Sequence, residues 1–383
     1  MSRPLRIAML THSTNPRGGV VHALQLADAL CGLGHEVAVH APDPAQRGFF
    51  RQGRAKNISV EAAPAPHNVG DMVEQRIAEY VEHFSRTAHA FDVFHAHDGI
   101  GANALATLKE RGMIRSFLRT VHHLDVFRDP RVQKRQEHSI TAADALFVVS
   151  PTWADALQRD YGRAATVVGN GVDLGRFSPN PSVTDAALRA RLRLGRGPIL
   201  LCVGGVEERK NSIRILRAFV GLRATHPDAQ LVIAGGASVL DHSAYNRAFQ
   251  SALDEAALPA GSLILPGVMS DAEMAALYRL ADVLVFASVK EGFGLVVLEA
   301  LASGTPVVVP RIAPFTGYLG ENDAAWCDPY DVSSITNAIQ HALTPARDGL
   351  IANGYAVAQR HGWAVTARAH LPVYAAIAEP AYA

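Results

Sequence analysis

The sequence is poor in cysteine, in long apolar runs and in excess charge of either sign, and each absence excludes a class of protein. Only three cysteines are scattered through 383 residues, which excludes a disulfide framework and favours a reducing compartment. No apolar run is long enough to cross a membrane, and the one near the N-terminus is too short for a signal peptide. Lys plus Arg equals Asp plus Glu at 36 each, so no global field attracts nucleic acid. We therefore expect a cytoplasmic protein.

Short runs of Val, Ile, Leu and Ala alternate with amphipathic segments, which is typical of βαβ units. The chain is 49% hydrophobic and 19% charged, the balance of a soluble globular protein, and its length predicts two domains. Strands are expected at 5–10, 36–42, 92–97, 114–122, 145–150, 198–205, 230–236, 262–267, 282–288 and 305–310. Helices are expected at 20–34, 72–88, 101–112, 151–162, 212–226, 243–258, 271–281 and 295–304.

The fold class that this alternation predicts is α/β, with two Rossmann-like domains. The apolar runs are too continuous for half-exposed strands, so both sheets should be parallel and covered on both faces. We expect an N-terminal domain over 1–175, a linker rich in Pro and Gly over 176–197, and a second domain over 198–362. A helix over 363–383 is expected to rejoin the first domain. Parallel sheets bind ligands beyond the carboxyl ends of their strands, so the two domains should face each other across a deep cleft.

The segment "KEGFGLVVLEAL" places Glu291 and Glu299 on either side of a Gly-Phe-Gly turn that opens a helix. The backbone N–H groups of Phe293, Gly294 and Leu295 can face an anion there. A carboxylate repels phosphate but accepts hydrogen bonds from vicinal hydroxyls, so the two glutamates are suited to sugars. This pattern describes a nucleotide sugar. The alternative is a glutamate that complements the helix dipole and a second that is solvated in a loop.

Two further turns carry groups suited to a diphosphate. In "CVGGVEERKNS", Arg209 and Lys210 lie between a buried strand and a helix that starts near Ser212, where cations can hold phosphates. Gly18 and Gly19 open the first helix and allow close approach of a ligand, although no dinucleotide-binding G-x-G-x-x-G is present. The alternative for each is an ordinary loop.

Four histidines follow two predicted strands, in "FHAHDG" and "TVHHLD". His95, His97, His122 and His123 can be interpreted as zinc ligands of a hydrolase. They can equally be neutral imidazoles that bind hydroxyls, or strand-end histidines satisfied by loop backbone.

Taken together, these blocks resemble a retaining glycosyltransferase of glycosyltransferase family 4 (the group 1 glycosyltransferases), which has the GT-B fold. The resemblance runs through nearly the whole chain. Besides the segments already quoted, it includes "GHEVAVHAP", "ADALFVVS", "VVGNGVDLGRF" and "LPGVMSDAEMAALYRLADVLVFAS". It implies transfer of a hexose from a nucleotide-sugar donor with retention of configuration, without a cofactor or metal. No D-x-D pair is present in the sequence to bind a metal.

The resemblance also implies a role for each matching residue. Glu299 would bind the ribose, Glu291 the transferred sugar, and Lys210 the diphosphate, while the backbone of Phe293, Gly294 and Leu295 would hold sugar and phosphate. His122 would lie over the donor sugar, Gly19 would allow the diphosphate and acceptor to approach, and the stretch around Val268 would contact the nucleobase. Catalysis would thus fall to Glu291, His122 and Lys210.

One position departs from the family pattern, in which an arginine follows "V-G". Gly205 stands there in this chain. Because Arg209 is adjacent to Lys210, we hypothesise that it supplies the missing cation.

The acceptor is an unidentified small molecule, glycan or lipid-linked hydroxyl compound. The segment "RGFFRQGRAK" at 47–56 combines paired Phe with basic residues, which suits either contact with the inner face of a membrane or a solvated loop. The functional alternatives are the metal-dependent hydrolase, a non-catalytic nucleotide-sugar binder and an epimerase. The epimerase would need a carboxylate acid–base pair that the sequence does not place.

Overall fold

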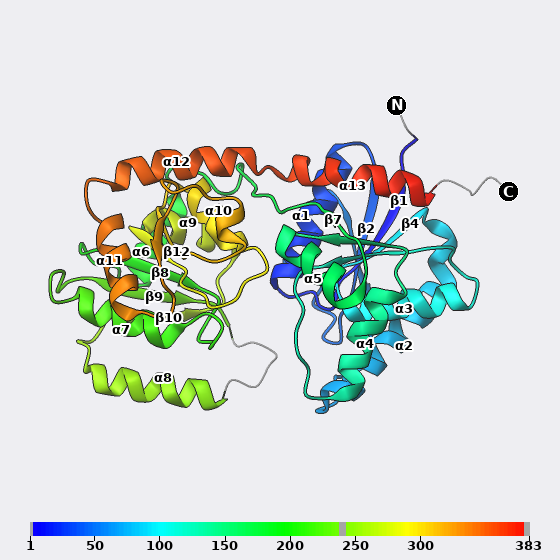
Figure 1. The fold of residues 1–383 in the computed structure, drawn as a ribbon, viewed down its shortest axis with the longest axis horizontal. Coiled ribbons are helices and arrows are strands. Elements are labelled where there is room, and N and C mark those ends of the chain that lie inside the picture. The colour runs from blue at the N-terminus through cyan, green and yellow to red at the C-terminus, as the bar shows by residue number, and fades with distance from the viewer. Residues whose placement is uncertain (1–2, 237–242, 379–383) are drawn as a thin grey trace. The chain divides into compact units, whose positions relative to one another are not determined.

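A computed structural model describes residues 3–236 and 243–378. The chain divides into two compact units, one of Met1–Gly171 with Trp363–Ala383 and one of Val172–Gly362 (Figure 1). Residues 379–383 of the predicted C-terminal helix lie outside the described residues. None of the helices among the described residues is long and apolar enough to span a membrane.

The first unit is a parallel sheet in the order β3-β2-β1-β4-β5-β6-β7 with helices on its faces. Its strands are β1 (Arg6–Leu10), β2 (Glu36–Pro42), β3 (Lys56–Val60), β4 (Val93–Ala96), β5 (Leu118–Val121), β6 (Ala145–Val148) and β7 (Thr166–Val167). Its helices are α1 (Gly18–Gly32), α2 (Val69–Thr87), α3 (Gly99–Glu110), α4 (Pro130–Thr141), α5 (Pro151–Tyr161) and α13 (Trp363–Ala378), with a 3-10 turn at Ala88–Ala90. The apolar strand centres are buried, as the continuous apolar runs predict.

The second unit is a parallel sheet in the order β10-β9-β8-β11-β12-β13. Its strands are β8 (Ile199–Val203), β9 (Gln230–Ala234), β10 (Leu263–Gly267), β11 (Val283–Val285), β12 (Val307–Pro310) and β13 (Ala325–Cys327). Its helices are α6 (Val183–Arg191), α7 (Ser212–Leu222), α8 (Ser243–Ala256), α9 (Asp271–Leu280), α10 (Leu295–Ala302), α11 (Val332–Ala342) and α12 (Arg347–Arg360), with a 3-10 turn at Phe315–Gly317. The predicted class of two parallel-sheet α/β domains is confirmed.

The segment 176–197, for which the sequence predicts a linker, belongs to the second unit. It contains α6, which packs against α9. The Arg279 guanidinium donates to both carboxylate oxygens of Asp185, with Nη2 2.6 Å from Oδ1 and Nε 3.0 Å from Oδ2. This ion pair, with side chains only 9% and 16% exposed, fixes α6 on the domain. Its two partners lie 94 residues apart in the chain, so local sequence patterns do not reveal it.

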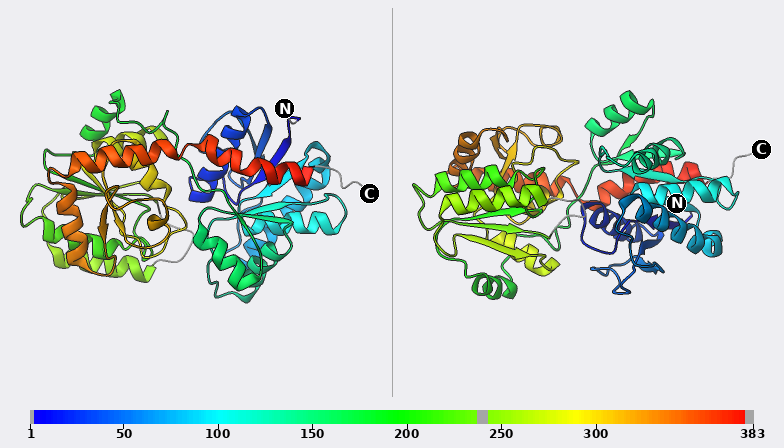
Figure 2. Two further views of the ribbon diagram at one scale, coloured as in Figure 1. Left: turned by 45° about the horizontal axis from the view of Figure 1, so that its top comes forward. Right: turned by 90° about the horizontal axis from the view of Figure 1, so that it is seen from below.

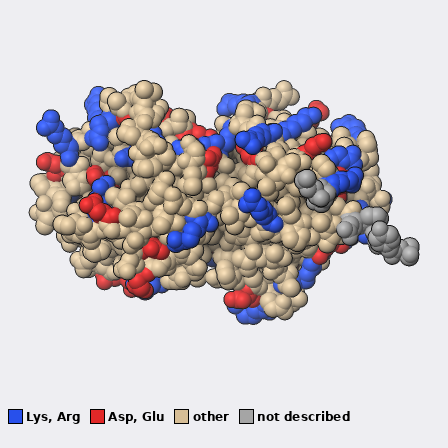
Figure 3. Space-filling model, turned by 90° about the horizontal axis from the view of Figure 1, so that it is seen from above, with Lys and Arg blue, Asp and Glu red and all other residues tan. Residues whose placement is uncertain are grey.

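The segment 47–56 forms a packed loop. The side chain of Phe49 is 7% exposed, and Asp43 accepts hydrogen bonds from the backbone N–H groups of Arg47 and Gly48. Phe50 is half-buried, with the Arg51 guanidinium 5.1 Å from the centre of its ring, so the two Phe side chains are not both exposed. On the face shown in Figure 3, basic and acidic side chains lie in small groups beside one another, in keeping with the balanced composition.

A cluster of histidines joins α13 to the first sheet, where this helix packs beside α1 (Figure 2). We call it the histidine cluster; its contacting rings lie 4.2 to 6.4 Å apart between centroids. Its members are His22, His95, His97, His122 and His370. The Tyr374 hydroxyl of α13 lies 2.7 Å from Nδ1 of His95 on β4, so a hydrogen bond also ties the helix to the strand. Burial lowers the pKa of His22 to about 4 and that of His370 to about 3, so both imidazoles are neutral near pH 7.

We expect Arg279→Ala to lower the free energy of unfolding by about 3 kcal/mol, because the Asp185 carboxylate then remains partly buried without its partner. Arg191→Ala is the matched control. It removes another ion pair between α6 and α9, with Glu273, but Arg191 is 51% exposed, and we expect a loss of less than about 1 kcal/mol. Urea unfolding of the two variants measures the difference, and equal losses would contradict this account of α6.

We expect the first unit to lose stability as the pH falls below about 6.5, where histidines of the unfolded chain take up protons that the folded cluster excludes. Between pH 7.5 and pH 5, the lowered pKa values of His22 and His370 each correspond to a loss of about 2 kcal/mol. Fluorescence of Trp153 and Trp363 in a Trp326→Phe background reports this unit alone.

In His370→Gln, the loss of unfolding free energy between pH 7.5 and pH 5 should be smaller than in the wild type by about 2 kcal/mol. His341→Gln, an exposed residue of the second unit, is the control and should leave it unchanged. If the stability of the first unit does not change between pH 7.5 and pH 5, the role assigned to the histidine cluster is wrong.

Candidate active site

Most of the predicted site residues meet at the carboxyl edge of the second sheet. The loops after the neighbouring strands β8 and β11 carry Arg209 and Lys210 on one side and Glu291 on the other. A backbone hydrogen bond of 3.0 Å from Val289 N–H to Arg209 C=O joins the two loops. The structure thus brings together cations and a carboxylate that lie about eighty residues apart in the sequence.

Glu291 is held between the two cations. Its Oε1 atom accepts hydrogen bonds from Nη1 of Arg209 at 2.5 Å and from Nζ of Lys210 at 2.6 Å. Nζ of Lys210 also lies 4.3 Å from the centre of the Phe286 ring, a favourable position for a cation. Burial opposes ionisation of Glu291, yet Lys210 and Arg209 outweigh it and keep the pKa of this carboxyl below its ordinary value. Burial lowers the pKa of Lys210, and the Glu291 carboxylate counteracts this shift.

The Gly-Phe-Gly turn is fixed by aromatic packing. Gly294 has φ +91°, and a Cβ atom there would lie 2.8 Å from Cε1 of Phe315, so only glycine fits. The Phe293 and Tyr318 rings stack at 4.7 Å with an interplanar angle of 4°, and the Tyr318 hydroxyl donates to the Phe293 carbonyl at 3.2 Å. Leu295 begins α10, as predicted. Tyr318 was missed by sequence reasoning because it follows a separate turn, near 315–317, with no motif of its own.

Glu299 lies on α10 and is half-buried. The hydroxyl of Tyr278, on α9, donates to its Oε2 atom at 2.7 Å. The Glu299 carboxylate is thereby oriented by a residue that the sequence did not single out, since Tyr278 is spaced like an ordinary core residue of its helix.

Asn211 was also missed by sequence reasoning. Its side-chain amide donates to the carbonyls of Ala287 at 3.0 Å and Pro329 at 2.6 Å, and these hydrogen bonds anchor the turn that carries the two cations.

Backbone geometry explains the glycine at position 205. Gly205 has φ +76°, and a Cβ atom there would lie 2.8 Å from the carbonyl oxygen of Gly236. At Gly204, φ is +124° and a Cβ atom would lie 2.6 Å from Cε of Lys210. This turn therefore has no room for an arginine at position 205.

Val268, the predicted nucleobase contact, lies beyond the end of β10 and is 67% exposed. It lies close to Gly236, since a Cβ atom on Gly236 would be only 2.7 Å from Cγ2 of Val268.

In the first unit, Gly19 and His122 lie together. A Cβ atom on Gly19, in the first turn of α1, would be 3.4 Å from Cδ2 of His122, so the glycine leaves room beside the ring. Nε2 of His122 is buried and has no hydrogen-bond partner among the described residues. Burial, and then the neighbouring His22 and His97, place the pKa of His122 well below its ordinary value. The imidazole is therefore neutral and suited to hydrogen bonding with a hydroxyl.

Two of the four histidines considered as zinc ligands have partners of their own, whereas both ring nitrogens of His97 are buried without a hydrogen-bond partner among the described residues. Both ring nitrogens of His95 are taken, by the Tyr374 hydroxyl and by Thr120 Oγ1, each at 2.7 Å. His123 instead pairs with Asp125, with Nε2 2.9 Å from Oδ2. Within residues 3–236 and 243–378, no group of three or more His, Cys, Asp or Glu side chains is placed to hold a metal ion. The geometry thus gives no support to the hydrolase alternative.

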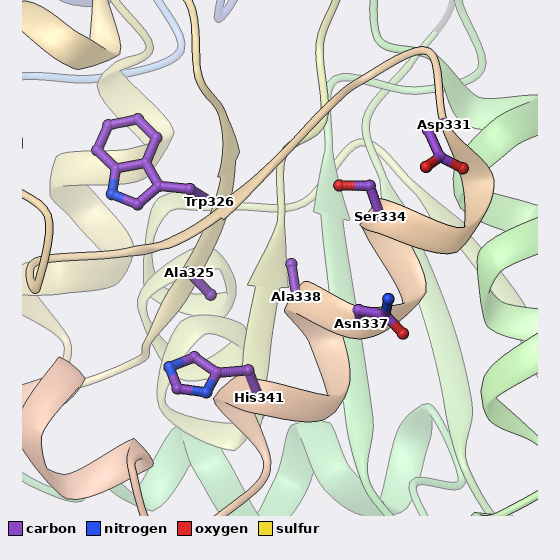
Figure 4. A pocket seen from close by; sticks show the side chains of 7 residues that line it. All are labelled: Ala325, Trp326, Asp331, Ser334, Asn337, Ala338 and His341. Atoms are coloured by element: carbon purple, nitrogen blue, oxygen red, sulfur yellow. The ribbon is translucent and has the colours of Figure 1, made fainter.

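A separate depression of about 460 Å³ lies between the edge strand β13 and α11. Figure 4 shows a stripe of side chains along α11 facing it, while the Trp326 indole points away from the helix. Its lining residues are Ala325, Trp326, Asp331, Ser334, Asn337, Ala338 and His341, and none of them is a predicted site residue.

Two family models match this chain in succession. Residues 16–176 match the model described as Glycosyltransferase Family 4, and residues 185–356 match the one described as Glycosyl transferases group 1. The two matches correspond to the two units of the structure.

Curated relatives resemble the chain along almost its whole length. A D-inositol 3-phosphate glycosyltransferase from Xylanimonas cellulosilytica is 30% identical over 415 residues, covering 98% of this chain and 97% of that protein. A phosphatidyl-myo-inositol mannosyltransferase from Propionibacterium freudenreichii is 26% identical over 370 residues, covering 91% and 89%.

Solved structures agree in fold. Sucrose-phosphate synthase from Thermosynechococcus elongatus matches with a TM-score of 0.80 at 21% identity, covering 97% of this chain and 99% of that one. The Anabaena protein HepE, in complex with UDP and glucose, matches with a TM-score of 0.78 at 17% identity, covering 97% and 99%. The chain therefore has the GT-B fold and belongs to the group 1 glycosyltransferases of glycosyltransferase family 4, enzymes that transfer a sugar.

Proposed function

We propose that this glycosyltransferase moves a hexose from a nucleotide-diphosphate sugar to a hydroxyl acceptor, with retention of configuration and without a metal. The observation that carries the donor assignment is the meeting of Arg209, Lys210, Glu291 and the turn before α10 at one sheet edge. Cations and the free N–H groups of a helix start suit a diphosphate, and the carboxylates suit the hydroxyls on either side of it. The solved relative with bound UDP and glucose supports this donor class.

In the proposed reaction, the bond between the sugar and the diphosphate breaks, and a bond to the acceptor oxygen forms on the same face. The leaving diphosphate takes the acceptor's proton. Lys210, Arg209 and the N–H groups of residues 293–295 stabilise the negative charge that develops on the diphosphate, which is where an enzyme of this kind gains rate. Glu291 hydrogen-bonds the transferred sugar, Glu299 binds the ribose, and Val268 lies beside the nucleobase, while the neutral imidazole of His122 is suited to a sugar hydroxyl.

For the acceptor, we propose a hydroxyl of a small molecule, glycan or lipid-linked compound. The names of the curated relatives include an inositol phosphate and a phosphatidylinositol, which supports a polyol with or without a lipid. The proposed location is the cytoplasm, with the inner face of the membrane as a site of action if the acceptor is a lipid.

The donor assignment is tested by thermal denaturation with UDP, GDP, ADP and their common sugar derivatives. We expect one base to stabilise the protein, by about 2.7 kcal/mol at a hundredfold excess over its Kd. Glu299→Ala should lose this stabilisation. Glu255→Ala, an exposed glutamate on α8, is the matched control and should keep it. The donor class is wrong if no nucleotide stabilises the wild-type protein.

We expect Arg209→Ala to lower kcat/KM about as much as Lys210→Ala, by roughly tenfold to a hundredfold each, because each removes a charge-assisted hydrogen bond to the diphosphate. Arg217→Ala, on the exposed face of α7, is the control and should have no effect. Steady-state kinetics with the donor found above measure the change. Wild-type turnover by Arg209→Ala would show that Arg209 does not compensate for Gly205.

A further inference from the structure

One carboxylate oxygen neutralises both cations of the proposed diphosphate site. Oε1 of Glu291 lies 2.5 Å from Nη1 of Arg209 and 2.6 Å from Nζ of Lys210. The Glu291 carboxylate therefore contacts both of the cations that the proposed function assigns to the phosphates.

Burial makes this arrangement strong. The side chain of Glu291 is 9% exposed and that of Lys210 is 14% exposed, so water screens their attraction weakly. Arg209 is 45% exposed and has a second carboxylate, Glu207, at 3.7 Å. The two carboxylates balance the charges of Lys210 and Arg209, so an incoming anion meets cations that are already paired.

We propose that Glu291 is an internal counter-ion that the donor's diphosphate must displace from Lys210 and Arg209, an inference that rests on the proposed donor. The exchange makes the site selective, since a nucleoside monophosphate offers less charge to compete with the buried carboxylate. The exchange also means that the diphosphate binds before the sugar is recognised. Glu291 becomes available to the hydroxyls of the transferred sugar only after the diphosphate has replaced it on Lys210 and Arg209.

The neighbouring contacts allow the exchange without a movement of the fold. The turn that carries the cations is held by Asn211 and by the Val289–Arg209 backbone hydrogen bond, neither of which involves the Glu291 side chain. Lys210 keeps its contact with the Phe286 ring as a support. In the proposed exchange the Glu291 side chain rotates away from the two cations, and repulsion between carboxylate and diphosphate favours that rotation.

The variant Glu291→Gln tests the exchange because it keeps the shape of the side chain and removes its charge. The probe is the nucleoside diphosphate, among UDP, GDP and ADP, that the wild-type protein binds most tightly, and calorimetry gives its Kd. We expect the variant to bind this diphosphate about tenfold more tightly, and its preference for diphosphate over the matching monophosphate to shrink. Sugar transfer should fall, since the contact to the sugar is weakened.

Two controls separate the exchange from simpler effects. Glu207→Gln removes one charge beside Arg209 without touching Lys210, and should change the Kd less than about threefold. Glu291→Asp retains the negative charge on a shorter side chain, so its Kd for the diphosphate should lie closer to that of the wild type than the Kd of Glu291→Gln does. Melting temperatures of all variants are measured alongside.

Equal or weaker binding of the diphosphate by Glu291→Gln overturns the exchange while leaving the proposed donor intact. If the wild-type protein binds none of the three diphosphates, the proposed donor fails first and the exchange fails with it.

Discussion

The candidate site in the second unit depends on two buried, oppositely charged side chains, Lys210 and Glu291, that neutralise each other. Lys210 is buried enough that its ammonium requires an anion, and Glu291 is buried enough that its carboxylate requires a cation, so each makes the other's charge tolerable. The two groups come from loops after neighbouring strands, and their pairing therefore depends on the parallel order of β8 and β11. The glycines at 204 and 205, the αL turn at Asn211 and the packing of Phe286 all serve to place these charges.

Aromatic residues hold Glu299 and the turn before α10 in position. Tyr278 orients Glu299, and Tyr318 holds Phe293 through both ring stacking and a hydrogen bond to its carbonyl. A site that must distinguish hydroxyls needs carboxylates with fixed directions, and long side chains on their own do not provide them. The buried phenol of Tyr278 supplies that rigidity for Glu299 without adding charge.

Much of this could be predicted from the sequence, because the signals were local. Continuous apolar runs revealed the parallel strands of both units, and the spacing of Glu291, Gly294 and Glu299 marked the turn before α10. Edge strand β3 and helix α4 escaped because both are largely polar. Edge strand β13 and helix α11 escaped as well. Tyr278, Tyr318 and Asn211 escaped for another reason, since their partners lie 21, 25 and 76 residues away and only the fold brings them together. The sharing of Glu291 by two cations is likewise a property of tertiary structure.

The path of the chain has a consequence for how the protein is made. The first unit is left at Gly171 and re-entered at Trp363, where the two passages touch: a Cβ atom on Gly171 would lie 2.6 Å from the Trp363 backbone nitrogen. The first sheet therefore emerges from the ribosome long before α13, and waits for an entire second unit to be synthesised before the histidines of α1 and β4 acquire their cover. A nascent chain spends that interval with an open apolar face. The first unit is therefore completed only after the whole of the second unit has been synthesised.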